Sequence, residues 1–143
     1  MVEIKIVAFD DAHCGLIRTV REQVFIQEQQ IDPEIEFDDL DSEAVHVLVM
    51  DGEQPLGTGR ILADGHIGHI GRIAIMKAAR GQGLGAKVVQ ALVEYAQQQG
   101  YPRVDLGAQT HAVDFYRKLG FMPYGEEFME ANIPHQAMEQ MLA

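Results

Sequence analysis

A glycine-rich loop in the second half of the chain constrains the fold more than any other feature. The apolar stretch Ile73–Met76 precedes the loop Arg80-Gly81-Gln82-Gly83-Leu84-Gly85, and a helical pattern of apolar residues continues up to Gly100. The next segment, Pro102–Gly107, alternates as a short strand. A strand, a loop, a helix and a second strand in this order join parallel neighbours through a right-handed crossover. The chain is therefore predicted to form a mixed sheet with helices on both faces.

The first half of the chain predicts an antiparallel meander, because Asp51-Gly52 and Asp64-Gly65 are tight-turn signals between apolar stretches. Near the N-terminus, Val2, Ile4 and Ile6 alternate with charged residues, which indicates a strand with one buried face. The predicted strands are Val2–Phe9, Ala44–Met50, Gln54–Ala63, His66–Met76, Pro102–Gly107, Phe121–Tyr124 and His135–Leu142. The predicted helices run from Asp10 to Gln29, from Leu84 to Gly100, and from Ala112 to Leu119 with Phe115 and Tyr116 on the buried face.

Length and composition are those of an ordinary globular domain. The chain has 143 residues, of which 47% are hydrophobic and 23% are charged. No apolar run reaches the roughly 20 residues of a membrane span, and the N-terminus has no secretory pattern. The single cysteine, Cys14, lies in a predicted helix, which favours an inert thiol in a reducing cytoplasm. We expect one cytoplasmic α+β (mixed α/β) domain over residues 1–143, without a membrane partner.

The charge of the chain is strongly acidic and unevenly distributed. Eleven Lys and Arg residues against 22 Asp and Glu residues give a net charge of −11, which argues against nucleic acid as a partner. Between Glu28 and Glu43 there are eight carboxylates and no Lys or Arg. Two interpretations stay open: a solvated loop that aids solubility, and a negative mouth that attracts a cationic substrate.

The glycine loop is suited to an anion, because glycines let the backbone approach closely and the first helical turn presents free N–H groups. A P-loop would need Gly-Lys-Ser/Thr, but Gly85-Ala86-Lys87 stands there. A dinucleotide fingerprint fits Gly81–Ala86, yet four residues separate it from the strand, and only about 60 follow it. The third candidate is a pyrophosphate clamp, with charge from Arg80 and backbone N–H groups at Gly83 and Gly85.

These residues carry a resemblance to a known family. Arg80-x-x-Gly83-x-Gly85 after a strand resembles the acyl-CoA pyrophosphate signature of the GNAT N-acetyltransferase superfamily, and Gln109–Phe121 resembles its second signature, Asn-x-x-Ala-x-x-x-Tyr-x-x-x-Gly-Phe. The element order matches over essentially the whole chain. The segments Val24–Gln29, Glu36–Asp41 and Ile133–His135 are further similar to the small bacterial ElaA/YjcF-like members.

The resemblance implies a centrally splayed sheet and an acetyl-CoA-dependent transfer of an acetyl group to a primary amine, by direct attack in a ternary complex. Pantetheine would pair with the backbone of Ile73–Ile75, as an added strand does, with the Ile75 amide as a donor to the acyl oxygen. Tyr116 occupies the general-acid position. The residues that the resemblance assigns to the cofactor are Ile73, Ala74, Ile75, Arg80, Gly81, Gln82, Gly83, Leu84, Gly85, Gln109 and Tyr116.

The general base does not follow from the resemblance. Where some members carry a Glu, this chain has His69-Ile70-Gly71-Arg72, and Gln109 replaces the family's Asn. The candidate bases are therefore His111, Glu28 and His135. No metal site is expected, because His66 and His69 would point to opposite faces of a strand.

The acceptor is expected to be a small-molecule or peptide amine, cationic if the acidic segment steers it. A homodimer is left open. A non-catalytic acyl-CoA-binding or regulatory module is the alternative function, and fold alone does not separate these functions.

Overall fold

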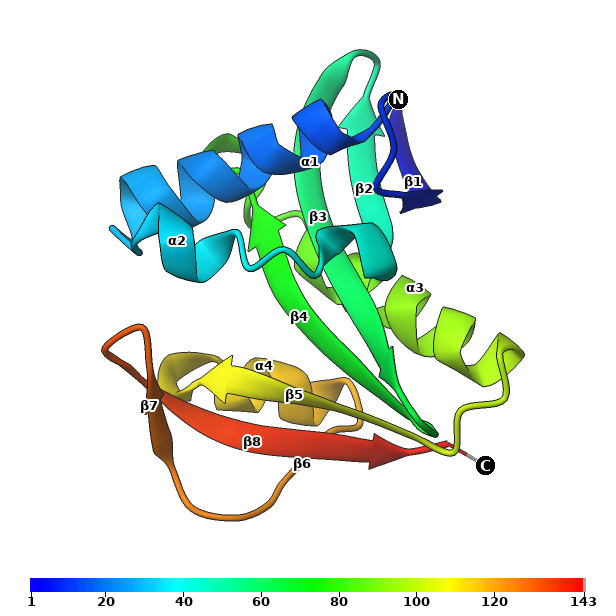
Figure 1. The fold of residues 1–143 in the computed structure, drawn as a ribbon, viewed down its shortest axis with the longest axis vertical. Coiled ribbons are helices and arrows are strands. Elements are labelled where there is room, and N and C mark those ends of the chain that lie inside the picture. The colour runs from blue at the N-terminus through cyan, green and yellow to red at the C-terminus, as the bar shows by residue number, and fades with distance from the viewer. Residues whose placement is uncertain (143) are drawn as a thin grey trace.

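A computed structural model describes residues 1–142 and shows one eight-stranded mixed sheet (Figure 1). The order along the sheet is β1-β2-β3-β4-β5-β8-β6, and β7 pairs with β8 outside this path. The pairing of β4 with β5 is parallel, as the predicted crossover requires, and the other neighbours are antiparallel. The strands are β1 Val2–Ala8, β2 Val45–Asp51, β3 Gln54–Asp64, β4 Ile67–Ile75, β5 Arg103–Gln109, β6 Met122–Pro123, β7 Phe128–Glu130 and β8 Ile133–Met141.

Helices cover both faces of the sheet (Figure 1). The helices are α1 Cys14–Arg21, the π-helix η1 Glu22–Glu28, α2 Pro33–Glu36, α3 Leu84–Gln98 and α4 Val113–Lys118, with single 3₁₀ turns at Asp41–Glu43, Lys77–Ala79 and Thr110–Ala112. The larger core lies under α3, where Val88 and Leu92 pack against Val47 and Val49 of β2. A smaller core joins Ile17 of α1 to β1 and β2 on the opposite face. No helix in residues 1–142 is long and apolar enough to cross a membrane.

The sheet is splayed at its centre. β4 and β5 pair only from Ile67 to His69 on one strand and from Arg103 to Asp105 on the other. Beyond these residues the two strands diverge, β4 staying with β3 and β5 with β8 (Figure 1). The last six residues of β4, from position 70 to 75, therefore have no partner on their β5 side. The predicted splayed mixed sheet with helices on both faces is confirmed.

A bulge interrupts β4 at the mouth of this gap. Two residues, Arg72 and Ile73, lie opposite the single Gly59 of β3, and Arg72 has a left-handed φ of 55°. Gly59 also lies under α3, where an added Cβ would be 2.7 Å from Val88 Cγ1. The absence of a side chain at Gly59 thus lets α3 pack closely against the sheet.

The apolar face of the first strand, which the alternation predicts to be buried, is exposed in the structure. Val2, Ile4 and Ile6 are 41%, 37% and 45% exposed, and Val7 is the buried residue of β1. The physical reason is position: β1 is an edge strand, so α3 covers its neighbours more fully than β1 itself, and α1 packs on the opposite face.

Other differences concern helix ends and the C-terminal region. The predicted first helix begins at Cys14, because Asp10 binds the amide of His13 and shapes a turn before it, and its second half is π-helical. Phe115 is 38% exposed and lines a cavity instead of packing in the core. The Phe121–Tyr124 strand shrinks to Met122–Pro123, and β7 was not predicted.

Candidate active site

The glycine loop borders a cavity of about 600 Å³ beside the N-terminus of α3, which we call the glycine-loop cavity. Gly81 and Gly83 have φ angles of 81° and 76°, in the left-handed region that favours glycine. Nothing lies within 4 Å of the position that a Cβ would take on either residue. The first amides of α3 have no acceptor within the helix and lie at this end. The loop thus offers open space and N–H donors to an anion.

Most of the residues predicted to bind the cofactor line this cavity, which runs from the loop along the free side of β4. Gln82 is not among its lining residues, and Gln109 lines the neighbouring cavity instead. The predicted residues that the structure brings together here are Ile73, Ala74, Ile75, Arg80, Gly81, Gly83, Leu84, Gly85 and Tyr116.

Arg80 has an acidic partner at the entrance of the glycine-loop cavity. Its Nη1 and Nη2 atoms donate to the two carboxylate oxygens of Glu28 at 2.5 and 2.6 Å, and its Nε donates to the carbonyl of Ile75 at 3.0 Å. The hydrogen bonds from Arg80 hold the pKa of Glu28 below its usual range, and Glu28 in turn raises the pKa of Arg80. Arg80, the one arginine of the loop, is therefore held in a bidentate ion pair when no ligand is bound.

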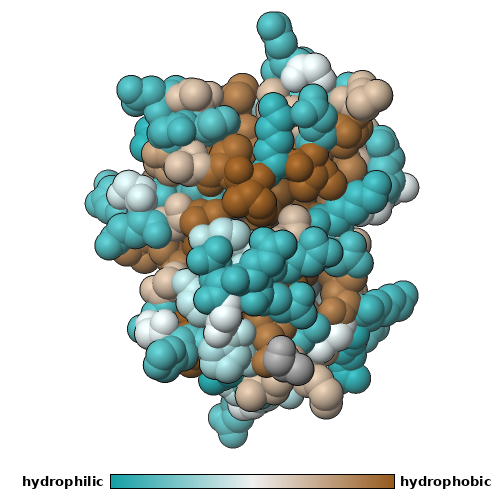
Figure 2. Space-filling view, turned by 90° about the vertical axis from the view of Figure 1, so that its right-hand side faces the viewer, coloured by the Kyte–Doolittle hydropathy of each residue, from teal (hydrophilic) through white to brown (hydrophobic). Residues whose placement is uncertain are grey.

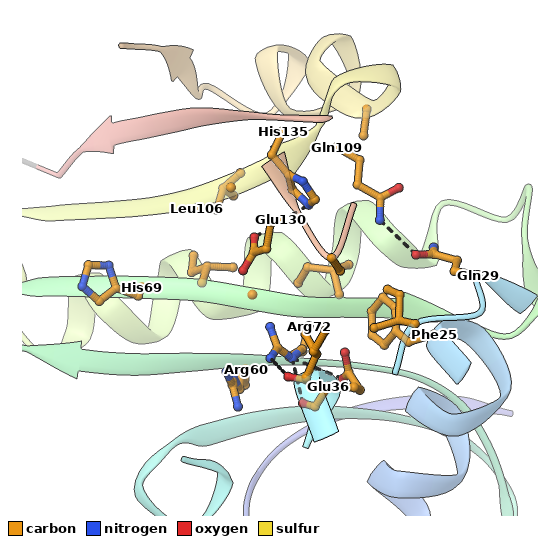
Figure 3. Close-up of a pocket in the computed structure, with 18 of the residues that line it drawn as sticks. Phe25, Gln29, Glu36, Arg60, His69, Arg72, Leu106, Gln109, Glu130 and His135 are labelled. Carbon is orange, nitrogen blue, oxygen red and sulfur yellow. Dashed lines mark hydrogen bonds and ion pairs between the residues drawn. The ribbon is translucent and has the colours of Figure 1, made fainter. Parts of the chain in front are cut away.

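A second cavity, of about 500 Å³, is lined by His69, His111 and His135 and is named here the histidine cavity (Figure 3). The two cavities share five lining residues: Gln29, Ile73, His111, Ala112 and Tyr116. A molecule bound in one cavity can thus meet a molecule bound in the other at Tyr116.

A side-chain bridge crosses the gap between the two halves of the sheet. Gln109 Nε2, at the end of β5, donates to Gln29 Oε1 at 3.0 Å (Figure 3). Gln29 follows the π-helix η1, whose wider turn also carries Phe25 into the histidine cavity and Glu28 into the glycine-loop cavity. One short segment therefore supplies a wall to both cavities.

Tyr116 lies where the cavities meet and is nearly buried. Its ring packs edge-on against Phe115 and Phe121, with centroids 5.0 and 6.0 Å away. Burial raises the pKa of Tyr116 to about 12. Within residues 1–142 no hydrogen bond engages its hydroxyl. The phenol is therefore protonated at neutral pH and available as a hydrogen-bond donor.

His135 and Glu130 form a pair in the wall of the histidine cavity (Figure 3). His135 Nδ1 lies 2.7 Å from the carbonyl of Ile133, and since a carbonyl can only accept, Nδ1 carries the proton. In the neutral ring, Nε2 then keeps its lone pair, 3.8 Å from Glu130 Oε2. Phe128 stacks on the ring and fixes its plane. Two acceptors thus lie side by side, an arrangement that a donor between them would satisfy.

The opposite wall is held by a cluster of three arginines and three carboxylates, Arg21, Arg60, Arg72, Glu36, Asp38 and Asp41. Arg21 binds Glu36 at 2.7 Å and Asp41 at 2.6 Å, all three being buried. Hydrogen bonds from Arg60 hold the pKa of Asp38 well below its usual range, whereas burial raises the pKa of Glu36 despite its arginine neighbours. The cluster fastens α2 and the following loop to β3 and β4.

This cluster corrects one interpretation of the acidic segment. A solvated loop is wrong for Glu36 and Asp41, which are 3% and 5% exposed. The segment is acidic because these carboxylates neutralise Arg21, Arg60 and Arg72, which belong to other elements. Glu28 is likewise paired, with Arg80. Fewer carboxylates are therefore free to steer a cation than the sequence suggests.

His69 lies at the opposite end of the histidine cavity from Gln29 (Figure 3). Its Nδ1 makes a short bond to Asp105, and its Nε2 lies 3.2 Å from Asp64. Although burial opposes it, the two carboxylates raise the pKa of His69. Both ring nitrogens are engaged, so His69 is poorly placed to accept a further proton.

Two site residues escape sequence reasoning. Gln29 lines both cavities directly after the π-helical η1, and no local sequence pattern marks that turn. Glu130 lies in β7, a three-residue strand without a clear alternation. Arg60 and Arg72 do carry a signal, since each interrupts an otherwise apolar or small stretch of a strand.

Comparisons with known proteins agree with this geometry. The family model described as an acetyltransferase (GNAT) domain matches residues 9–142. An uncharacterized N-acetyltransferase of Bacillus subtilis, YjcF, is 42% identical over 120 residues, which cover 83% of this chain and 86% of that protein. Two crystal structures are each 27% identical and cover 98% of this chain and 99% of theirs: an acyl-CoA N-acyltransferase from Pseudomonas aeruginosa, TM-score 0.88, and Escherichia coli ElaA, TM-score 0.86.

Proposed function

The chain belongs to the GNAT acetyltransferase family, and from this premise we propose that it transfers the acetyl group of acetyl-CoA to a primary amine. The observation that carries the proposal is the meeting of two cavities at Tyr116, one with an anion-binding loop and one with an imidazole and a carboxylate. Two substrates held in these cavities would react directly, in a ternary complex.

The residues of the glycine-loop cavity fit a CoA molecule. The open space above Gly81 and Gly83, with the first amides of α3, suits a pyrophosphate. The unpaired side of β4 from Ile73 to Ile75 suits an amide-bearing arm that binds as an added strand. CoA would supply the thioester that activates the acetyl group. Gln109 would reach the arm from β5 after releasing Gln29.

Tyr116 is the donor to the departing sulfur in this proposal. Its raised pKa, about 12, keeps the hydroxyl protonated wherever the reaction would be run. Complete proton transfer to a thiolate with a pKa near about 8.5 would be uphill from such a phenol. Tyr116 therefore stabilises the sulfur by donating a hydrogen bond, and solvent can supply the proton afterwards.

His135 is the best placed of the three candidate bases. Glu28 is bound to Arg80 on the cofactor side, and its lowered pKa makes it a poorer base. His111 is exposed, and no hydrogen bond within residues 1–142 orients its ring. His135 has a fixed tautomer with Nε2 free for a proton, and Glu130 beside it suits a cationic acceptor. An ammonium between them would bind Glu130 and pass its proton to His135.

The test is turnover with acetyl-CoA and a panel of primary amines, measuring released thiol and, by mass spectrometry, the acetylated amine. We expect thiol release that depends on the amine. Binding of CoA by calorimetry, with no acetylated product from any amine in a broad panel, would favour the non-catalytic CoA-binding module instead.

A further inference from the structure

Strand β1 leaves one edge of the sheet open. It is the terminal strand of the sheet order, and in residues 1–142 it pairs only with β2. The backbone groups on its outer side are therefore free to pair with another strand. Figure 1 shows β1 at the margin of the molecule with no element beyond it.

The face of β1 that continues the buried core face of the sheet is apolar. Ile4 and Ile6 lie opposite Val49 and Val47, which are fully buried, so the core face continues onto β1 and becomes exposed there. Figure 2 views the molecule from the side on which β1 lies and shows hydrophobic side chains gathered on its upper half. Natural edge strands usually avoid such a surface unless something covers it.

The sequence of β1 is complementary to itself. If two copies of β1 run antiparallel with Ile4 opposite Ile4, then Val2 lies opposite Ile6, and Glu3 lies opposite Lys5. A shift of the two-fold axis to Glu3 or to Lys5 would place like charges opposite each other. A shift by half a residue pair would place charged residues opposite apolar ones. The charges thus select the register centred on Ile4.

We propose that a second copy of this chain covers this edge, with two β1 strands pairing antiparallel about a two-fold axis at Ile4 to make one continuous sheet. Each copy has a net charge of −11, so two copies repel each other. The proposed contact avoids this repulsion locally, because each Glu3 lies opposite a Lys5 and the charges at the interface sum to zero. Both side chains are about half exposed in the single chain, at 61% and 49%, and so are free to change partners. The inference does not depend on the acetyltransferase activity.

Charge reversal tests the interface without touching the core. We expect the wild-type protein to show a concentration-dependent dimer in sedimentation velocity. Glu3→Lys and Lys5→Glu should each weaken the dimer by about tenfold or more, since each creates two like-charged cross-strand pairs. The double variant Glu3→Lys/Lys5→Glu restores opposite charges and the original net charge, so it should dimerise like the wild type.

Three outcomes would overturn the proposal: a wild type that stays monomeric at every concentration, single variants that dimerise unchanged, or a double variant that fails to recover. Thiol release by all four proteins should be equal, because neither Glu3 nor Lys5 lines a cavity. A loss of activity without a change of mass would concern the proposed function and not the interface.

Discussion

A single hydroxyl, that of Tyr116, stands between the two cavities, and its environment decides what it can do. The aromatic rings of Phe115 and Phe121 surround the phenol and leave no charged group to stabilise its anion. Burial therefore makes Tyr116 a permanent donor and a weak acid. The same burial excludes water from the place where charge would develop on sulfur, which strengthens the hydrogen bond that forms there.

Replacing Tyr116 with Phe should lower kcat by about 10- to 200-fold, the value of one hydrogen bond to a charged group. The ring and its packing remain, so CoA affinity by calorimetry should stay within about twofold. In the wild type, activity should show no alkaline decline from this residue as pH approaches 10, because its pKa is about 12. Tyr124→Phe removes a hydroxyl outside both cavities and is the matched control. An unchanged kcat would leave Tyr116 as a core residue only.

Substitutions of His135 and of Glu130 should change different kinetic parameters. His135→Gln removes the proposed proton acceptor and should lower kcat/KM by about 100-fold or more. Glu130→Gln keeps the shape and removes the charge, so it should raise KM for amines and leave kcat within a few-fold. The exposed control His66→Gln should leave kcat/KM unchanged, because His66 lines neither cavity. An unchanged kcat/KM in His135→Gln would assign the base elsewhere.

At the scale of elements, the glycine loop and η1 act on each other through Arg80 and Glu28. The arginine that the resemblance assigns to the pyrophosphate is held by a carboxylate from the first half of the chain. A phosphate at the guanidinium would compete with Glu28 for its charge, although two of the five N–H donors of Arg80 are not engaged within residues 1–142. In the protein without cofactor, the Glu28 carboxylate therefore occupies a position at Arg80 that a phosphate group of the proposed cofactor could take.

Glu28→Gln should strengthen CoA binding by about 1.5- to 5-fold, because an exposed ion pair contributes about 0.2–1 kcal/mol. Gly83→Val should weaken it strongly, since valine is strained at a φ of 76° and would fill the open space beside the loop. Glu34→Gln changes the net charge equally in the same acidic segment and is the calorimetric control. Weaker binding by Glu28→Gln than by Glu34→Gln would mean that Glu28 itself supports the cofactor.

The sequence predicts elements well where a local rule decides them. The crossover, the two tight turns and the glycine loop follow from spacing and from turn chemistry. The buried face of β1 could not be predicted, because alternation marks an apolar face without saying whether a helix reaches it. The π-helical η1 could not be predicted either, because its sequence Glu22–Glu28 carries no pattern that separates a π-helix from an α-helix. Phe25 within η1 and Gln29 directly after it are consequently cavity-lining residues that the sequence does not assign to the site.

For the whole molecule, the cluster around Arg21 is the main link between the acidic segment and the sheet. It joins α1, α2 and the loop before β2 to strands β3 and β4 through buried charge. Such a cluster stabilises only when complete, because removal of one member leaves its partners buried and unpaired. When the protein unfolds, the wall of the histidine cavity formed by this cluster should therefore be lost in the same transition as the rest of the fold.

Asp41→Asn should lower the free energy of unfolding at pH 7 by about 3–5 kcal/mol, measured by urea denaturation. Although burial opposes it, the bonds from Arg21 and Arg60 lower the pKa of Asp41 in the folded state. Its contribution is thus present above the unfolded value near about 3.9 and lost as pH falls through the folded value. The difference between wild type and variant should shrink as pH falls below that range. Asp39→Asn, exposed and at a φ of 65° that asparagine tolerates, should change stability little. Equal losses in both variants would contradict a special role for the cluster.

Gly59, which lies between the β4 bulge and α3, has a consequence for protein engineering. An alanine there would press on Ile73 and Val88 and push against α3, whose first turn carries the amides proposed to bind phosphate. In a screen for activity, alanine at position 59 would thus be rejected like a substitution in the cofactor site, although its methyl group would contact neither proposed substrate. Other walls of the histidine cavity, where the acceptor is proposed to bind, come from η1 and β7, and neither segment is among the nearest neighbours of a Cβ at Gly59. Libraries aimed at new acceptors can therefore randomise those segments while β3, β4 and α3 are left as they are.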